Sequence, residues 1–185
     1  MTHHRRRNNG IDPSKINETV ELSPAQRYAA FKQTQAKQRT VAAEFARSMP
    51  FELDEFQMQA NDALEAGDNV LVAAPTGAGK TVAADFAIYL AQTRNVKAFY
   101  TTPIKALSNQ KYHDLVDQYG TDKVGLLTGD TSINSEADIV VMTTEVLRNM
   151  LYEHSVTLEA LRYVILDEVH YLADRFRGPV WEEVI

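Results

Sequence analysis

Residues 73–81 read AAPTGAGKT, and this stretch decides the fold. The apolar run NVLVAA around Val70 precedes it and is expected to be a β-strand, while the pattern TVAADFAIYLAQTR that follows is typical of a helix. Gly77 and Gly79 can adopt backbone conformations that other residues avoid, so successive N–H groups can turn inward around phosphate oxygens. A strand, a glycine-rich turn and a helix start together predict a P-loop.

The side chains of this loop have matching chemical roles. Lys80 would place a positive charge beside the β- and γ-phosphates of a nucleotide, and Thr81 would offer its hydroxyl to Mg²⁺. Ala74 stands where the pattern G-x-x-x-x-G-K-[ST] has its first glycine, and alanine fits there if its φ angle is negative. The alternative is a glycine-rich turn that contains a lysine by chance. The predicted nucleotide-binding residues of the loop are Pro75, Thr76, Gly77, Ala78, Gly79, Lys80 and Thr81.

Beyond the loop, short apolar runs alternate with helical patterns. The order predicts an α/β fold, an open parallel sheet that is doubly wound with helices on both faces. Small, polar or charged residues follow every run, and ligands of such sheets bind at the carboxyl ends of the strands. One functional edge is therefore expected. The runs are KAFY near Phe99, VGLL near Leu126, DIVVM near Val140 and YVIL near Ile165.

Two acids, Asp167 and Glu168, follow the last of these runs in YVILDEVH. A P-loop needs a second, acidic anchor for Mg²⁺, which Asp167 can supply, directly or through a water. Glu168 would then orient and deprotonate an attacking water. We therefore predict Asp167, Glu168 and Lys80 as catalytic residues, with Thr81 and Asp167 as ligands of Mg²⁺. The alternative is a solvated strand end.

Composition sets wider limits on the 185-residue chain. Its net charge of −6 argues against a generally basic nucleic-acid clamp, although local backbone donors can still bind phosphates. The absence of cysteine excludes disulfides and thiolate zinc sites, and the histidines show no ligand spacing. A cytoplasmic protein is expected, because the sequence has neither an apolar run of membrane-spanning length nor a signal-peptide pattern.

The N-terminal part differs from the rest. Residues 1–22 are polar and without periodicity, which predicts a disordered tail, and their arginines, Arg5 to Arg7, could contact nucleic acid or simply be solvated. Ser23, Pro24 and Gln26 form a capping-box pattern, which predicts one N-terminal helix over 23–50 that Pro50 ends.

Together these motifs resemble those of the superfamily 2 DExH-box helicases, and most closely those of the bacterial branch of the Ski-type DEVH-box RNA helicases. The resemblance runs from about Phe51 to Ile185. It implies a RecA-like P-loop NTPase that uses ATP and Mg²⁺, with nucleic-acid-stimulated ATP hydrolysis driving the unwinding of RNA strands. The matching stretches are AAPTGAGKT for motif I, TTPIKALSNQK for Ia, GLLTGD for Ib, MTTEVLRNML for Ic, DEVH for motif II, and RGPVWEE after it.

The resemblance also implies site residues that spacing alone does not give. FELDEFQ is similar to the family's adenine-recognition motif, in which Gln57 would recognise the base and Phe51 would pack near it. Alternatively, Gln57 forms a capping box with Asp54, and Phe51 is ordinary core. His170 would couple the hydrolytic site to the nucleic acid. The residues implied to contact single-stranded nucleic acid are Thr102, Pro103, Lys105, Asn109, Gln110, Thr128, Gly129, Asp130, Thr143, Thr144 and Glu145; Thr102, Thr143 and Thr144 could instead cap helices.

The family's motor has two RecA-like domains, and the second supplies arginine fingers. This chain ends 18 residues after Asp167 (185 − 167), and none of its arginines occupies a finger motif. We therefore expect a truncated first domain over 51–185, the N-terminal piece of a longer helicase, whose partner is a missing C-terminal helicase domain. The alternative is an isolated module that binds ATP and RNA with negligible turnover.

Overall fold

The computed structural model describes residues 23–37 and 39–185, and these belong to two compact units that are divided between Thr40 and Val41. The predictions for residues 1–22 lie outside the described residues. In the first unit, helix α1 (Pro24–Lys37) begins with the expected capping box. The Ser23 N–H donates to Gln26 Oε1 at 2.8 Å, and the Gln26 N–H donates to Ser23 Oγ at 3.3 Å.

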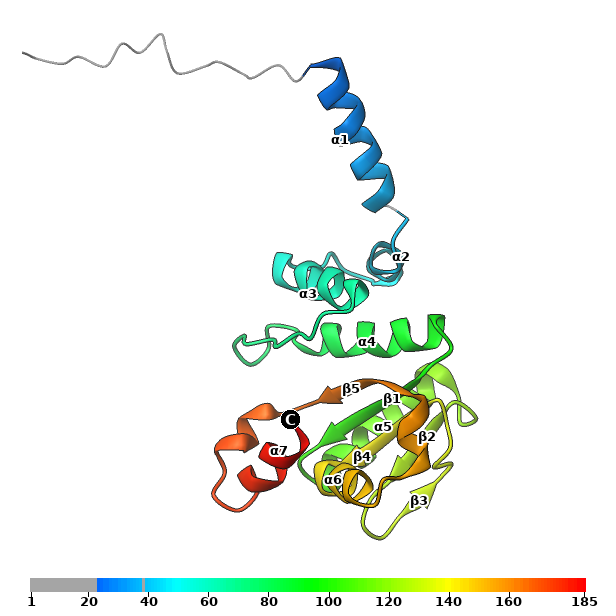
Figure 1. Cartoon of the computed structure of the whole chain (residues 1–185), viewed down its shortest axis with the longest axis vertical. Helices are drawn as coiled ribbons and strands as arrows, with labels where there is room; N and C mark the ends of the chain where they lie inside the picture. Colours follow the sequence, from blue (N-terminus) through cyan, green and yellow to red (C-terminus); the bar gives the residue numbers. More distant parts are fainter. Residues whose placement is uncertain (1–22, 38) are drawn as a thin grey trace, which may run out of the picture. The chain divides into compact units, whose positions relative to one another are not determined.

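A single helix over 23–50 is not what the structure shows. The second unit starts with a separate helix, α2 (Val41–Ser48), because the carboxylate of Glu65 accepts hydrogen bonds from the N–H groups of Val41 at 3.0 Å and Ala42 at 2.7 Å. This side chain from α3 (Glu55–Ala66) satisfies N–H groups that a new helix start leaves free. Figure 1 shows α2 and α3 beside α4 (Thr81–Thr93).

The sheet follows the predicted alternation of strands and helices. In chain order its elements are β1 (Lys97–Thr102), α5 (Lys105–Tyr119), β2 (Val124–Leu127), β3 (Ser132–Ile133), β4 (Ile139–Thr143), α6 (Thr144–Tyr152) and β5 (Leu161–Leu166). The 3₁₀ segments η2 (Val156–Ala160) and η3 (Val169–Ala173) flank β5, and α7 (Gly178–Val184) comes last. The strand order is β3-β2-β4-β1-β5, parallel except for the short β3, which runs antiparallel to β2 (Figure 1).

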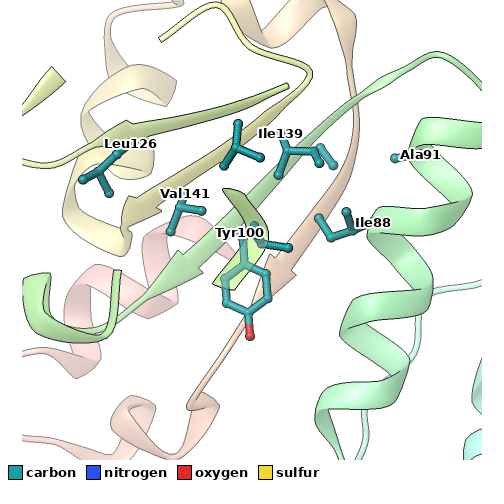
Figure 2. Packing of buried hydrophobic residues seen from close by; sticks show 9 residues of the cluster. Ile88, Ala91, Tyr100, Leu126, Ile139 and Val141 are labelled. Atoms are coloured by element: carbon teal, nitrogen blue, oxygen red, sulfur yellow. The ribbon is translucent and has the colours of Figure 1, made fainter. Parts of the chain in front are cut away.

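Helices cover both faces of this sheet, as predicted. Because side chains alternate along a strand, Tyr100 of β1 and Val141 of β4 point to one face and Phe99 and Val140 to the other. On the first face, side chains of α4 and α5 complete a cluster that includes Ile88 (Figure 2). On the second face, Phe99 packs in a cluster with residues of α6 and α7.

Two segments depart from the prediction of fully covered strands. The run 69–74, expected to be the strand before the P-loop, is irregular, and Leu71 is 78% exposed. Strand β5 pairs with β1 on one side, and within the described residues its other edge pairs with no strand. Val164 of β5 is accordingly 44% exposed. The run 69–74 forms no ladder of hydrogen bonds with any described strand and lies outside the sheet.

Candidate active site

The glycine-rich loop has the backbone that its sequence predicts. Gly77 and Gly79 have φ angles of +83° and +76°, in the region that side chains disfavour. Ala74 is not among the non-glycine residues of positive φ in the described chain, so alanine fits in place of the first glycine of the motif. The loop ends at Thr81, the first residue of α4, whose positive N-terminal end therefore faces the loop.

Lys80 folds back over this loop. Its Nζ atom donates hydrogen bonds to the carbonyl oxygens of Ala74 at 2.8 Å and Pro75 at 3.0 Å. The side chain remains exposed, so the ammonium group is accessible from solvent while its position is fixed. A positive charge in a glycine-rich loop at the N-terminal end of a helix suits the phosphates of a nucleotide.

Gln57 links the start of α3 to the loop. Its Oε1 accepts a hydrogen bond from the Asp54 N–H at 2.8 Å, and its Nε2 donates to the Gly79 carbonyl oxygen at 3.0 Å. The side chain is 4% exposed. The capping-box alternative is therefore present in the structure, and Gln57 also supports the P-loop. Recognition of adenine by Gln57 stays a prediction.

Phe51 lies on the surface beside this helix start, with 51% of its area exposed. It lines a pocket of about 580 Å³ together with Met49, Leu53 and Met58. The ordinary-core alternative for Phe51 does not fit this exposure. Apolar side chains around an open pocket are suited to a flat ring such as adenine, and the packing of Phe51 near adenine stays a prediction.

The two acids lie at the carboxyl end of β5. The Asp167 N–H donates to the Thr101 carbonyl oxygen at 3.0 Å, which continues the β1–β5 ladder. Oδ1 of Asp167 accepts the Glu168 N–H at 2.8 Å, and Oδ2 accepts the hydroxyl of Tyr100 at 2.7 Å. Glu168 has a φ angle of +58°, which is uncommon outside glycine and is enriched at functional sites. In Figure 1 the loop before α4 lies on the same side of the second unit as this end of β5.

His170 is placed next to Glu168. Its Nδ1 lies 3.0 Å from Glu168 Oε2, and its side chain is 71% exposed. The centroid of its ring also lies 4.8 Å from that of the Tyr171 ring, with the two ring planes tilted by 41°. His170 thus contacts Glu168, the predicted general base, and also reaches solvent. This position fits the coupling of the hydrolytic site to nucleic acid, which stays a prediction.

The predicted nucleic-acid residues gather at the carboxyl ends of β1, β2 and β4. The hydroxyl of Thr144 donates to the Thr102 carbonyl oxygen at 3.3 Å, which joins motifs Ic and Ia. Several of the hydroxyls expected to meet phosphates are buried: Thr102, Thr128, Thr143 and Thr144 are at most 8% exposed. The hydroxyl of Thr102 hydrogen-bonds within its own turn, to Ile104 O at 3.0 Å and Ser108 Oγ at 2.8 Å. No side-chain capping bond is formed by Thr143 at the start of α6.

Charged and backbone donors remain at the surface of this edge. Lys105 at the start of α5 forms an ion pair with Asp130 at 2.5 Å, with side chains 47% and 67% exposed. The hydrogen bond from Lys105, and next the one from Thr128, hold the pKa of Asp130 below its usual value. Asp130 thus stays ionised and masks part of the charge of Lys105. Of the other predicted contacts, Gln110 and Gly129 are exposed, Asn109 and Glu145 are half-buried, and Pro103 is buried.

The donor set fits Mg²⁺ better than a metal held wholly by protein. In the described part of the chain no group of three or more His, Cys, Asp or Glu side chains could hold a metal ion. One carboxylate, Asp167, and one hydroxyl, Thr81, match an ion that takes its remaining ligands from water and substrate phosphates. Sequence reasoning missed Tyr100, which holds the Asp167 carboxylate, because nothing in a strand pattern indicates a partner 67 residues away.

Comparisons with known proteins agree with this geometry. The chain is 64% identical over 141 residues to "Probable helicase HelY" of Mycobacterium tuberculosis, covering 76% of this chain and 16% of that protein. It is 54% identical over 140 residues to "Antiviral helicase SKI2" of Saccharomyces cerevisiae, covering 76% of this chain and 11% of that protein. The chain thus spans less than one fifth of the length of these relatives.

Solved helicase structures share the fold. A hypothetical ATP-dependent RNA helicase from Sulfolobus tokodaii matches with a TM-score of 0.59 and 26% identity, over 78% of this chain and 45% of that one. Mycobacterium smegmatis helicase Lhr, bound to single-stranded DNA and AMP-PNP, matches with a TM-score of 0.58 and 30% identity, over 76% of this chain and 21% of that one. The predicted RecA-like fold is confirmed. The family model for the DEAD/DEAH box helicase matches residues 54–185, and the chain belongs to that family.

Proposed function

We propose that this chain supplies the nucleotide-binding half of an ATP-dependent RNA helicase, in which ATP hydrolysis drives strand unwinding. The observation that carries the proposal is the presence of a P-loop at the start of α4 together with an oriented Asp167 and its neighbour Glu168 at the end of β5. Nucleotide binding and hydrolysis need a phosphate-binding loop together with an acidic anchor for Mg²⁺ and a residue that positions water.

The residues of the P-loop and of the segment after β5 have different roles in the proposed hydrolysis. The loop N–H groups and Lys80 bind the phosphates of ATP, and Thr81 and Asp167 hold Mg²⁺. When bound, Mg²⁺ neutralises charge that develops on the transferred phosphoryl group. Glu168 orients a water and takes its proton. The exposed donors at the ends of β1 and β2 track the sugar-phosphate backbone of a single strand.

RNA is the proposed strand, in a cytoplasmic protein. Support comes from relatives named as RNA helicases, such as "ATP-dependent RNA helicase mtr4" of Schizosaccharomyces pombe, which is 49% identical over 140 residues. Two of the solved neighbours, MrfA and Lhr, are bound to DNA. A competition between single-stranded RNA and DNA of equal sequence measures the preference directly, and tighter DNA binding would contradict this part of the proposal.

Binding of ATP is tested with the 185-residue chain and a fluorescent ATP analogue. Lys80→Ala removes the ammonium group from the loop and is expected to weaken binding by at least an order of magnitude, as loss of a charged hydrogen-bonding partner does. Lys123→Ala is the matched control. Lys123 directly precedes β2, at the amino ends of the parallel strands, and forms an ion pair with Asp138 there. Equal binding by the Lys80 and Lys123 variants would contradict the P-loop assignment.

The second candidate function is a module that binds ATP and RNA but hydrolyses ATP at a negligible rate when it is isolated. Coverage of 16% of a helicase relative favours it, since a second motor domain with arginine fingers raises the rate of phosphoryl transfer by about 10³–10⁵ in related enzymes. ATP hydrolysis that RNA stimulates and that Glu168→Gln abolishes, measured on the isolated chain, would overturn the module and favour a self-sufficient enzyme.

A further inference from the structure

Tyr100 carries a polar group in an apolar cluster. It lies in the middle of β1 and is 1% exposed. Its buried neighbours, among them Ile88, Leu126 and Val141, are aliphatic. Figure 2 shows its ring beside these side chains with the oxygen directed away from them. A buried hydroxyl needs a hydrogen-bond partner, and the direction of this one leads to the carboxyl end of β5.

The partner is the predicted Mg²⁺ ligand. The Tyr100 hydroxyl donates to Oδ2 of Asp167 at 2.7 Å, and the Glu168 N–H donates to Oδ1 at 2.8 Å. Both carboxylate oxygens therefore have a fixed donor, and the backbone of Asp167 is held by Thr101 O at 3.0 Å. An ionised carboxylate oxygen only accepts hydrogen bonds, so the Tyr100 hydroxyl is the donor in this contact.

The ring of Tyr100 is itself held from the helix side. Nζ of Lys111 on α5 lies 4.9 Å from the ring centroid, and the same atom pairs with Asp85 Oδ1 at 2.9 Å. Asp85 lies on α4, one helical turn after Thr81. The elements that carry the two predicted Mg²⁺ ligands, α4 and β5, are thus joined through Asp85, Lys111 and Tyr100.

We propose that Tyr100 is a positioning residue of the Mg²⁺–nucleotide site: its hydroxyl, fixed by the core and by Lys111, holds the Asp167 carboxylate in one orientation before the ligands bind. This inference rests on the proposed nucleotide-binding function. In other proteins, groups that hydrogen-bond to a metal-ligating side chain and so orient it contribute about 10–100-fold to metal affinity. The hydroxyl of Tyr100 takes that place here.

The test is Tyr100→Phe, which removes one oxygen and keeps the ring. Binding of N-methylanthraniloyl-ADP to the 185-residue chain is measured in EDTA and then over a series of Mg²⁺ concentrations. The variant should bind as the wild type does in EDTA, while the Mg²⁺ concentration that gives half of the Mg²⁺-dependent change should rise about tenfold. Tyr119→Phe is the matched control, because Tyr119 packs against the same cluster and its hydroxyl contacts Gln118.

A double-mutant cycle separates positioning from a general structural role. In an Asp167→Asn background, Tyr100→Phe should no longer change the Mg²⁺ midpoint, because the residue acts through that carboxylate. An unchanged midpoint in the single variant, or an equal shift in the Asp167→Asn background, overturns the inference. A wild-type chain that binds no nucleotide overturns the proposed function and this inference with it.

One measurement needs no disruptive substitution. With 3-fluorotyrosine introduced at position 100 alone, the ¹⁹F resonance should move when Mg²⁺ is added to the nucleotide-bound chain. The same label at position 119 should report no such change. A resonance at position 100 that does not respond to Mg²⁺ overturns the inference even if Tyr100→Phe fails to fold.

Discussion

Substitution of Gly79 is restricted by its backbone conformation and by a close neighbour, whereas substitution of Gly77 is restricted by its backbone conformation alone. Both have positive φ, but a Cβ on Gly79 would lie 2.6 Å from Gln57 Nε2, whereas a Cβ on Gly77 would meet nothing within 4 Å. Gly77→Ala should therefore cost only the backbone term, about 1–2 kcal/mol of unfolding free energy. Gly79→Ala should cost about 1 kcal/mol more, because Gln57 must move and lose its hydrogen bond to the loop. Denaturant unfolding of both variants measures the difference.

The Gln57→Ala background provides the control for this pair. Without the Gln57 amide, the two glycine variants should be equally destabilised. If Gly79→Ala still lowered the unfolding free energy more than Gly77→Ala in that background, the extra cost at Gly79 would come from another part of the loop and not from Gln57.

At the scale of single residues, the sequence predicts what a fixed backbone pattern dictates. The positive φ of Gly77 and Gly79 follows from the loop motif, and the place of Asp167 follows from the end of an apolar run. The contact of Tyr100 with Asp167 depends on the register of β1 against β5, in which Tyr100 pairs with Ile165. The hydrophobic pattern indicates which face of the sheet a side chain takes, but it does not say which residue of a distant strand lies opposite.

Helix α3 buries a polar side chain without compensation. Asn61 is 1% exposed, and among the described residues neither Oδ1 nor Nδ2 has a hydrogen-bond partner. Burying such groups unpaired costs about 1–3 kcal/mol. Asn61→Leu should therefore stabilise the chain by an amount in that range, measured as an increase in unfolding free energy.

Helix propensity contributes to such a change and must be subtracted. Asn149→Leu on α6 is the control, because Asn149 is exposed and helical, and its effect should stay below about 0.7 kcal/mol. If Asn61→Leu destabilised the chain, the amide would have a partner that the described contacts lack.

At the scale of elements, helices were predicted better than the strand before the P-loop. The patterns for α4, α5 and α6 are bounded by local polar breaks, and the structure has a helix over each of them, although none of the three starts has a side-chain capping bond. The run 69–74 is apolar enough for a strand, yet it forms no ladder even though the outer edge of β5 is unpaired, so an apolar run by itself does not predict pairing. The break between α1 and α2 was missed for a related reason, since the carboxylate that caps α2 comes from Glu65 on another helix.

For the molecule as a whole, the open edge of β5 is a place for unwanted pairing. Its outer backbone groups have no ladder partner among the described residues, and Val164 is 44% exposed. Edges of this kind pair with other chains unless charges block them. The wild-type chain should therefore associate as its concentration rises, and Val164→Lys should sediment as a monomer over the same range in analytical ultracentrifugation.

Val156→Lys separates the edge from general surface hydrophobicity. Val156 is 78% exposed but lies on η2, outside the sheet, so its replacement should leave the association unchanged. A monomeric wild type, or equal effects of the two lysine variants, would show that the edge of β5 does not drive the association.

The hydrogen bonds from Lys80 to Ala74 O and Pro75 O also bear on how tightly a nucleotide can bind. The loop solvates its own ammonium group, so an incoming phosphate gains only the difference between anionic oxygens and two neutral carbonyls. The same carbonyl groups restrict the rotamers of the Lys80 side chain, so the side chain loses little conformational entropy when a nucleotide binds. These contacts therefore lower the affinity for a nucleotide and fix the position of the ammonium group before the nucleotide binds.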